Sequence, residues 1–217
     1  MTPDIVFDEQ THTYLVDGKE VPSVTTILQP ISNRAYSAVN PSVLEYARNR
    51  GTAIHEALEM YDLGGEIEAS PETAPYIKAY LDWYSIYRPK WTGVEQIVYH
   101  NIDGYIGTLD RIGYLNGTEL AIVDIKTSQP TKEALVSVCC QTSAYAMAYT
   151  QEDYIRGSYL KIKRYGLFLK ADGTYRFQDC KEYERKYEFS GDDVFMSLLC
   201  DHKMITRILA TNTRGKK

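Results

Sequence analysis

The segment YIGTLDRIGYLNGTELAIVDIKT, residues 105–127, decides how this chain is organised. Apolar and β-branched residues stand on both sides of Asn116-Gly117, which is a strong signal for a tight turn between two antiparallel strands. We therefore expect a long hairpin, with strands over about 105–115 and 119–127.

The hairpin should bring chemically active side chains together. Side chains alternate between the two faces of a strand, so Asp124 and Lys126 project to the same face. Counting outward from the turn places Asp110 beside Val123 or Asp124, and a one-residue bulge would align the two aspartates. Two carboxylates and an ammonium group are thus expected on one small patch.

Such a patch suits the hydrolysis of a phosphodiester. That reaction needs a cation to offset developing charge and to lower the pKa of the attacking water. Hard cations such as Mg²⁺ prefer carboxylate oxygens, and a neighbouring lysine can orient the water and neutralise the phosphate. An Asp-X-Lys tripeptide by itself is equally typical of an ordinary surface ion pair.

Two predicted helices carry further candidates. The Asn40-Pro41 pair is a helix-start signal, and a helical pattern follows it to about residue 61. On this helix His55 and Glu59 are four residues apart, and so lie on one face, although a single helical histidine is often only structural.

A second helix, expected over 132–149, places Gln141 and Tyr145 on one face directly after Lys126. A position at the edge of the core would also explain this pair. The order of the remaining elements predicts one α/β domain with a central mixed sheet flanked by helices. The other expected elements are an N-terminal hairpin of strands 12–16 and 19–24 around Asp17-Gly18, a short helix from Ser23 to Leu28 that stops before Pro30, a helix over 71–89, a strand over 93–100, a strand pair around Asp172-Gly173, and a C-terminal helix from about Asp192.

Composition limits the class of protein. The chain has 217 residues, 44% hydrophobic and 24% charged, which is typical of one globular domain. Neither a secretory signal nor an apolar run of ~20 residues is present, so we expect a cytoplasmic protein without membrane contact. The net charge of −5 argues against a generally basic surface but does not exclude a local nucleic-acid groove.

The cysteines do not resemble a metal-binding or disulfide framework. There are four of them, Cys139, Cys140, Cys180 and Cys200, and none forms a CxxC pair. We expect them to be small apolar core residues.

Four separated motifs make the chain resemble a known superfamily. In order, they are GxxxH ending at His55, GxxD ending at Asp110, the DIK of residues 124–126, and QxxxY over 141–145. This set resembles the RecB-type branch of the PD-(D/E)XK nucleases. Within it, the stretches around Pro22, His55 and residues 106–128 resemble the mitochondrial genome maintenance exonuclease and its phage-encoded relatives. The resemblance covers about 22–149, more than half of the chain.

The resemblance implies roles for the matching residues. His55, Asp110 and Asp124 would bind Mg²⁺ or Mn²⁺, together with the backbone carbonyl of Ile125. Lys126 would position or activate the water, so that Asp110, Asp124 and Lys126 form the catalytic group.

Four more side chains receive supporting roles from the same resemblance. Gln141 and Tyr145 would contact the DNA backbone near the scissile phosphate. Glu95 matches a glutamate of that branch and would support the metal ligands from outside. Glu59 would hold His55 in one tautomer, as carboxylates around metal sites often do.

The implied fold is a restriction-endonuclease-like core. It would comprise a helical region over 22–90 that carries His55 and an arch, a catalytic sheet with the QxxxY helix over 91–180, and a C-terminal helix over 190–212. Many RecB-type nucleases hold an iron–sulfur cluster on four cysteines, one of them ahead of the core. Here no cysteine precedes Cys139, so no such cluster is expected.

The expected function is cleavage of single-stranded DNA from its ends, and the expected protein partners are phage or host proteins of recombination or replication. Three alternatives remain open at this point. A structure-selective or nicking endonuclease would use the same site, and an inactive DNA-binding recombination accessory protein would keep only the fold. A metal hydrolase acting on a substrate other than nucleic acid is the third.

Overall fold

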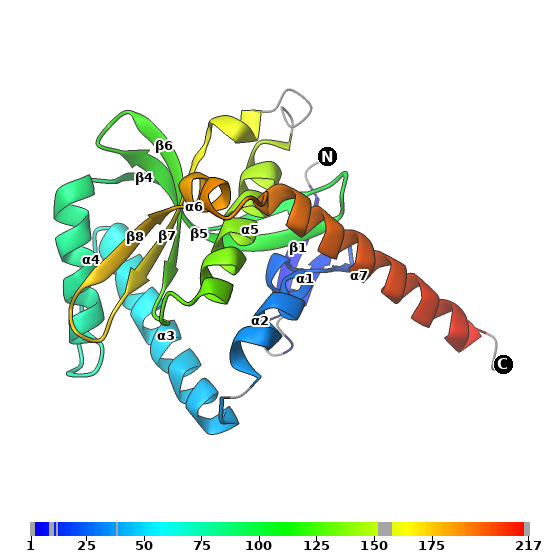
Figure 1. The fold of residues 1–217 in the computed structure, drawn as a ribbon, viewed down its shortest axis with the longest axis horizontal. Coiled ribbons are helices and arrows are strands. Elements are labelled where there is room, and N and C mark those ends of the chain that lie inside the picture. Colours follow the sequence, from blue (N-terminus) through cyan, green and yellow to red (C-terminus); the bar gives the residue numbers. More distant parts are fainter. Residues whose placement is uncertain (1–2, 9–10, 12, 38, 152–157, 215–217) are drawn as a thin grey trace.

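The N-terminus forms a small sheet. In the computed structural model, the described residues are 3–8, 11, 13–37, 39–151 and 158–214 (Figure 1). Strands β2 (Thr13–Val16) and β3 (Lys19–Val21) form the predicted hairpin, and φ is +49° at Asp17 and +72° at Gly18 in the turn between them. An additional strand, β1 (Ile5–Asp8), pairs with β2, which makes three antiparallel strands. His12, the first residue of the predicted strand, lies outside the described residues.

The main sheet has five strands in the order β4-β5-β6-β7-β8. Only β6 and β7 pair in parallel, and helix α5, at the predicted bounds Lys132–Tyr149, lies between them in the sequence. The mixed sheet flanked by helices agrees with the prediction (Figure 1). The strands are β4 (Lys90–His100), β5 (Tyr105–Leu115), β6 (Glu119–Lys126), β7 (Lys163–Leu169) and β8 (Tyr175–Asp179).

Local capping signals explain where two of the helices before the sheet begin. The Ser23 side chain accepts a hydrogen bond from the Thr26 amide, and that of Asn40 accepts one from the Ser42 amide, as expected of N-caps. The helices are α1 (Val24–Ile27), α2 (Gln29–Tyr36), α3 (Pro41–Asp62) and α4 (Ala74–Tyr87). After α5 come the 3₁₀ turn η2 (Ser158–Lys161), α6 (Cys180–Lys186) and α7 (Gly191–Arg214).

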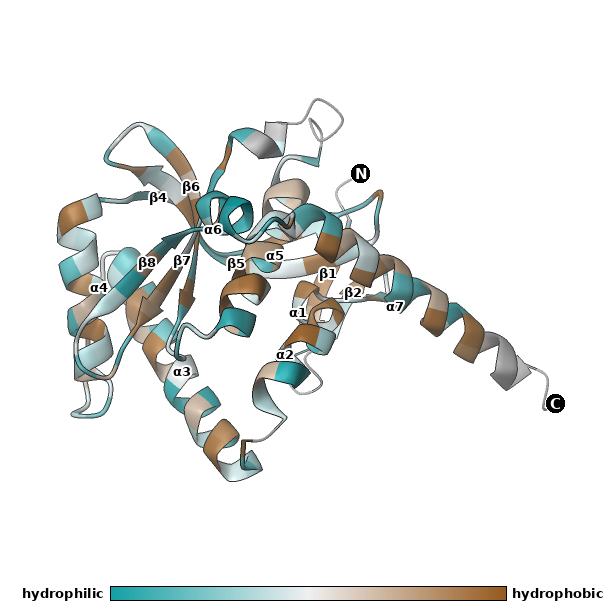
Figure 2. Cartoon of the chain, in the orientation of Figure 1, coloured by the Kyte–Doolittle hydropathy of each residue, from teal (hydrophilic) through white to brown (hydrophobic). Residues whose placement is uncertain are grey.

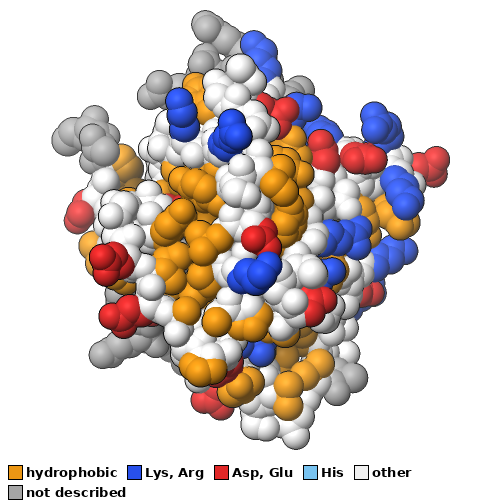
Figure 3. All heavy atoms as spheres, turned by 90° about the vertical axis from the view of Figure 1, so that its left-hand side faces the viewer, with side chains coloured by type: hydrophobic (Ala, Val, Ile, Leu, Met, Phe, Trp, Pro, Cys, Tyr) orange, Lys and Arg blue, Asp and Glu red, His pale blue; other side chains and the backbone are white. Residues whose placement is uncertain are grey.

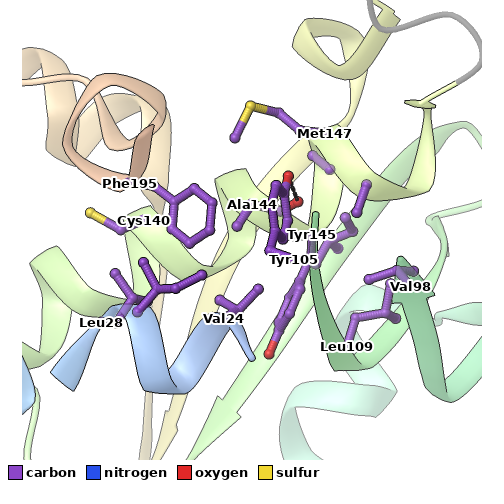
Figure 4. Packing of buried hydrophobic residues seen from close by; sticks show 14 of the residues in the cluster. Val24, Leu28, Val98, Tyr105, Leu109, Cys140, Ala144, Tyr145, Met147 and Phe195 are labelled. Atoms are coloured by element: carbon purple, nitrogen blue, oxygen red, sulfur yellow. Dashed lines mark hydrogen bonds between the residues drawn. The ribbon is translucent and has the colours of Figure 1, made fainter. Parts of the chain in front are cut away.

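The strand alternation of β6 divides the core into two layers. Ile122 packs in a cluster with α1, α5 and α7, whereas Val123 and Ile125 pack with α3 and α4 on the other face. Figure 4 shows Val24 and Leu28 meeting α5 and Phe195 in the first cluster. Asp124 and Lys126 have the same parity as Ile122 and therefore lie on the α5 side.

The predicted short helix does stop before Pro30, because α1 ends at Ile27 with Leu28 as its C-cap. The helix that follows directly, α2, was not predicted; Pro30 occupies its first turn, where its missing N–H has no hydrogen-bond partner to lose. The sequence pattern also did not reveal β1 or α6. Cys139, Cys140 and Cys180 are buried as expected, but Cys200 is exposed on α7.

The outer surface differs between regions. The face on the α4 side carries many apolar side chains between scattered charges (Figure 3), including exposed Leu81 and Ile86. Helix α7 extends from the body, and apolar and polar residues alternate along its outer half (Figure 2), where Met204 and Ile208 are exposed. Within the described residues no helix is both long and apolar enough to cross a bilayer.

Candidate metal-binding active site

Three elements bring a histidine and two carboxylates together. His55 comes from α3, Glu95 from β4 and Asp110 from β5. One ligand-type atom from each lies within 4.8 Å of the others. His55 Nδ1 is 3.8 Å from Glu95 Oε1 and 3.9 Å from Asp110 Oδ2, so the imidazole faces both carboxylates.

The hairpin register places Asp110 without the bulge that the sequence suggested. Arg111 faces Val123, so continuing the ladder by one step sets Asp110 opposite Asp124. Beyond the last backbone pair, a side chain replaces the backbone acceptor: the Ile125 amide donates a hydrogen bond of 2.6 Å to Asp110 Oδ2. The irregular register lies instead between β4 and β5, at Trp91.

Helix α3 reaches the end of β6 through the GxxxH motif. The His55 Nε2–H donates to the Ile125 carbonyl over 3.1 Å. A side chain at Gly51, one turn earlier, would begin 3.3 Å from Thr127 Oγ1, so the glycine permits this close approach. Burial by itself would lower the pKa of His55, but Asp110 and Glu95 outweigh it and raise that pKa above 6.5.

Asp124, which is fully buried, pairs on the α5 side with the partly exposed Lys126. Lys126 Nζ donates to Asp124 Oδ1 over 3.1 Å, whereas Oδ2, at 2.8 Å from the same nitrogen, has no partner with hydrogen-bond geometry. Burial, with a contribution from Asp110, raises the pKa of Asp124 to about 6 although Lys126 opposes the shift. For Lys126, burial favours the neutral amine, yet Asp124 and Asp110 raise its pKa, and it stays an ammonium.

Gln141 and Tyr145, the QxxxY residues, are joined to this ion pair by hydrogen bonds. Lys126 Nζ also donates to Gln141 Oε1 over 3.1 Å, and Gln141 Nε2 donates to the Tyr145 hydroxyl over 2.9 Å. The ring of Tyr145 lies against Gly107, where a Cβ would come within 2.8 Å of Tyr145 Cε1. The glycine of the GxxD motif therefore makes room for the tyrosine of the QxxxY motif.

Glu95 and Glu59 differ in their relation to His55. Glu95, expected to support the ligands from outside, contributes a donor atom to the three-residue group itself. Its φ of +44° is rare for a residue with a side chain, and it redirects the carboxylate within β4. Glu59, expected to orient His55, makes no hydrogen bond or ion pair with it among the interactions of the described residues.

The donor atoms fit a hard divalent cation. An imidazole nitrogen with carboxylate oxygens suits Mg²⁺ or Mn²⁺, and Asp124 Oδ2 offers a further buried oxygen without a hydrogen bond. Asp124 is turned toward Lys126, and the Ile125 carbonyl toward His55. To bind an ion, Asp124 would exchange its contact with Lys126 for one with the ion, and the Ile125 carbonyl would do the same with its contact to His55.

Sequence reasoning missed two charged residues beside the group, Arg111 and Asp62. Arg111 is the one basic residue between Tyr105 and Leu115 in the strand sequence, which is a signal for a buried ion pair. Asp62 is seven residues after His55, about two helical turns, and thus on the same side of α3.

No family model matches this chain, and neither does any curated protein.

Proposed function

We propose that this chain is a metal-dependent deoxyribonuclease of the RecB-type branch of the PD-(D/E)XK superfamily, which cuts single-stranded DNA from its ends. The observation that carries the proposal is the convergence of His55, Glu95 and Asp110 next to the Asp124–Lys126 ion pair. Glu95, Asp110 and Asp124 bring three carboxylates into one partly buried space, and a bound cation would offset their mutual repulsion.

His55, Glu95 and Asp110 would hold Mg²⁺ or Mn²⁺, with Asp124 and the Ile125 carbonyl completing the site. When bound, the ion would polarise the phosphate and lower the pKa of the attacking water.

Lys126 offsets negative charge on the phosphate and donates a hydrogen bond to the water or to a phosphate oxygen. Because its pKa is raised, it acts as a cation rather than as a proton acceptor in this state. Gln141 holds the ammonium from its other side, and Tyr145 holds Gln141. This chain of contacts fixes the ammonium beside the site before substrate arrives, which is the condition for electrostatic catalysis.

A pocket next to Lys126 supports a single-stranded substrate. It encloses about 420 Å³, which is within the range of roughly 300–1,000 Å³ found for pockets that bind single small molecules. Residues of α1, α2, α3 and α5 surround it, including Tyr36 and Arg48 from the predicted arch region, and Lys126 and Gln141 form part of its wall. A space of this size suits an unpaired nucleotide, with Arg48 and Lys126 available for its phosphates.

The overall charge of −5 does not oppose this placement, since the cations that matter are local. On the α4 side, apolar side chains lie between scattered charges (Figure 3). The DNA is proposed to pass along the α2–α3 side of Lys126, where Arg48 and Lys126 line one pocket.

A gel assay with end-labelled DNA tests the proposal. Linear and circular single-stranded and double-stranded DNA are incubated with Mg²⁺, Mn²⁺ or EDTA. We expect shortening of the linear single strand with either metal and no reaction with EDTA. Cleavage of circular single strands would identify an endonuclease, and binding without cleavage under every condition would identify an accessory protein.

The pH dependence of metal stabilisation gives a second test. The folded, metal-free protein binds protons at Asp124 and His55 more tightly than the unfolded chain, since both pKa values are raised. The contribution of Asp124 to the free energy of unfolding therefore falls as pH rises from about 4 to about 6, and the contribution of His55 falls as pH rises above 6.5. Metal ligands must lose these protons, so we expect Mn²⁺ to raise the melting temperature more at about pH 8 than at about pH 5.5. An equal rise at both pH values, measured by differential scanning fluorimetry, would contradict the assignment of these groups.

A further inference from the structure

Arg111 is a buried cation that touches three parts of the site's framework. Its Nε donates to Asp62 Oδ2 over 2.6 Å, and its Nη1 donates to Glu95 Oε1 over 2.8 Å and to the Asp110 carbonyl over 2.7 Å. The side chains of Arg111 and Asp62 are both fully buried. The guanidinium thus joins α3, β4 and β5, the three elements that supply His55, Glu95 and Asp110.

Asp62 is itself held from a second side. The Tyr80 hydroxyl of α4 lies 2.9 Å from one Asp62 oxygen and 2.7 Å from the other. The carboxylate is therefore fixed between α4 and Arg111 at the end of the helix that carries His55. Arg111 contacts Asp62 through Nε and Glu95 through Nη1, so the planar guanidinium fixes the geometry between two carboxylates as well as supplying charge.

Glu95 is the residue on which this arrangement acts. Its backbone is in the left-handed region, which persists only where surrounding contacts hold it. The oxygen that accepts from Arg111 is the same Oε1 that lies 3.8 Å from His55 Nδ1. Without the guanidinium, a glutamate with 26% of its side chain exposed would be free to turn toward solvent.

We propose that Arg111, clamped by Asp62, is a positioning residue that holds Glu95 beside His55 and Asp110 and so sets the cation affinity of the site. The inference rests on the cation site of the proposed function but not on DNA cleavage. Arg111 acts through Glu95 and does not itself contact the ion, because a guanidinium carries no acceptor.

The chain contains a matched reference for this pair. Arg164 is also buried, and its Nη2 donates to both Glu184 oxygens, over 2.8 and 2.9 Å. Its Nη1 donates to the Cys139 carbonyl, and neither Glu184 nor Cys139 belongs to the proposed site. Loss of either guanidinium should cost stability, whereas only loss of the Arg111 guanidinium should change the cation site.

The test compares Arg111→Lys with Arg164→Lys. Lysine keeps the charge but lacks the planar fork, so Glu95 and Asp62 can no longer be held together. Mn²⁺ affinity is measured by isothermal titration without DNA, and melting temperature by circular dichroism. We expect Arg111→Lys to bind Mn²⁺ roughly 10–100-fold more weakly, as is usual for residues that support metal ligands. Arg164→Lys should lower the melting temperature but bind Mn²⁺ like the natural chain.

A second pair of variants serves if Arg111→Lys does not fold. Asp62→Asn releases the clamp while Arg111 remains, and Glu184→Gln is its reference; the first should weaken Mn²⁺ binding and the second should not. Unchanged Mn²⁺ affinity in the folded variants of Arg111 and Asp62, or equal weakening in the Arg164 and Glu184 references, would overturn the inference. So would a natural chain that binds no Mn²⁺. If the natural chain binds Mn²⁺ and the variants differ as expected, but no DNA is cut, the proposed function fails while this inference stands.

Discussion

Replacing Lys126 with methionine is expected to reduce DNA cleavage by about a thousandfold, since a positioned charge or proton donor contributes on that order. In the part of the chain that the structure describes, its ammonium is the cation paired with Asp124, and Gln141 holds it in place. Methionine preserves the length and apolar stem of the side chain but removes the charge. Rates of cleavage of end-labelled single-stranded DNA at saturating Mn²⁺ measure the effect.

Stability must be separated from catalysis in this experiment. Without Lys126 the buried Asp124 loses its counter-charge, which is normally destabilising, although Asp124 can then take up a proton because its pKa is already about 6. Lys126→Arg keeps a positive charge near Asp124 but alters its geometry, and we expect it to fold and still cleave poorly. Lys163→Met, at an exposed lysine where β7 begins, is the matched control and should cleave normally. A folded Lys126→Met that cleaves at the natural rate would refute the role given to this lysine.

The second large effect is expected for His55→Ala. Removing the imidazole takes away the nitrogen donor that lies beside both Glu95 and Asp110, so Mn²⁺ affinity should fall by about 100-fold or more. DNA binding measured in EDTA should change little, since the proposed DNA contacts lie on the Gln141 and Arg48 side. Isothermal titration with Mn²⁺ and fluorescence anisotropy with single-stranded DNA separate the two.

The control for this variant is His202→Ala, because His202 lies on α7 and lines a separate pocket beside the N-terminal sheet. It should leave both affinities unchanged. His55 also donates to the Ile125 carbonyl, so the melting temperature of His55→Ala is expected to fall slightly without metal. If DNA affinity in EDTA fell as much as Mn²⁺ affinity, His55 would be a structural or DNA-binding residue and not a metal ligand.

The raised pKa values of His55, Asp124 and Lys126 share one contributing cause. Asp110 lies next to both His55 and the Asp124–Lys126 pair, so its charge helps to raise the pKa of all three of these groups. The metal-free site therefore keeps protons that a bound cation would displace. This coupling between proton release and metal binding is typical of sites assembled from buried ligands.

Local sequence signals determined much of the fold because they depend on neighbouring residues only. The Asn116-Gly117 turn has φ of +49° and +80° as its residue types favour, and helix α5 has the bounds its pattern predicts. Strand alternation placed Asp124 and Lys126 on one face. The Asn40-Pro41 pair started α3 through a side-chain cap that involves no distant contact.

Only the tertiary structure decided which distant groups meet. Asp62 and Arg111 are 49 residues apart in the chain, and no local periodicity encodes their contact. Glu95 joins His55 and Asp110 because its backbone leaves the regular strand conformation, which a pattern of alternation does not predict. The sequence by itself therefore specified the elements and the residue types of the site. Register, helix docking and the buried guanidinium determined which carboxylates lie beside the histidine, because these depend on packing between segments far apart in the chain.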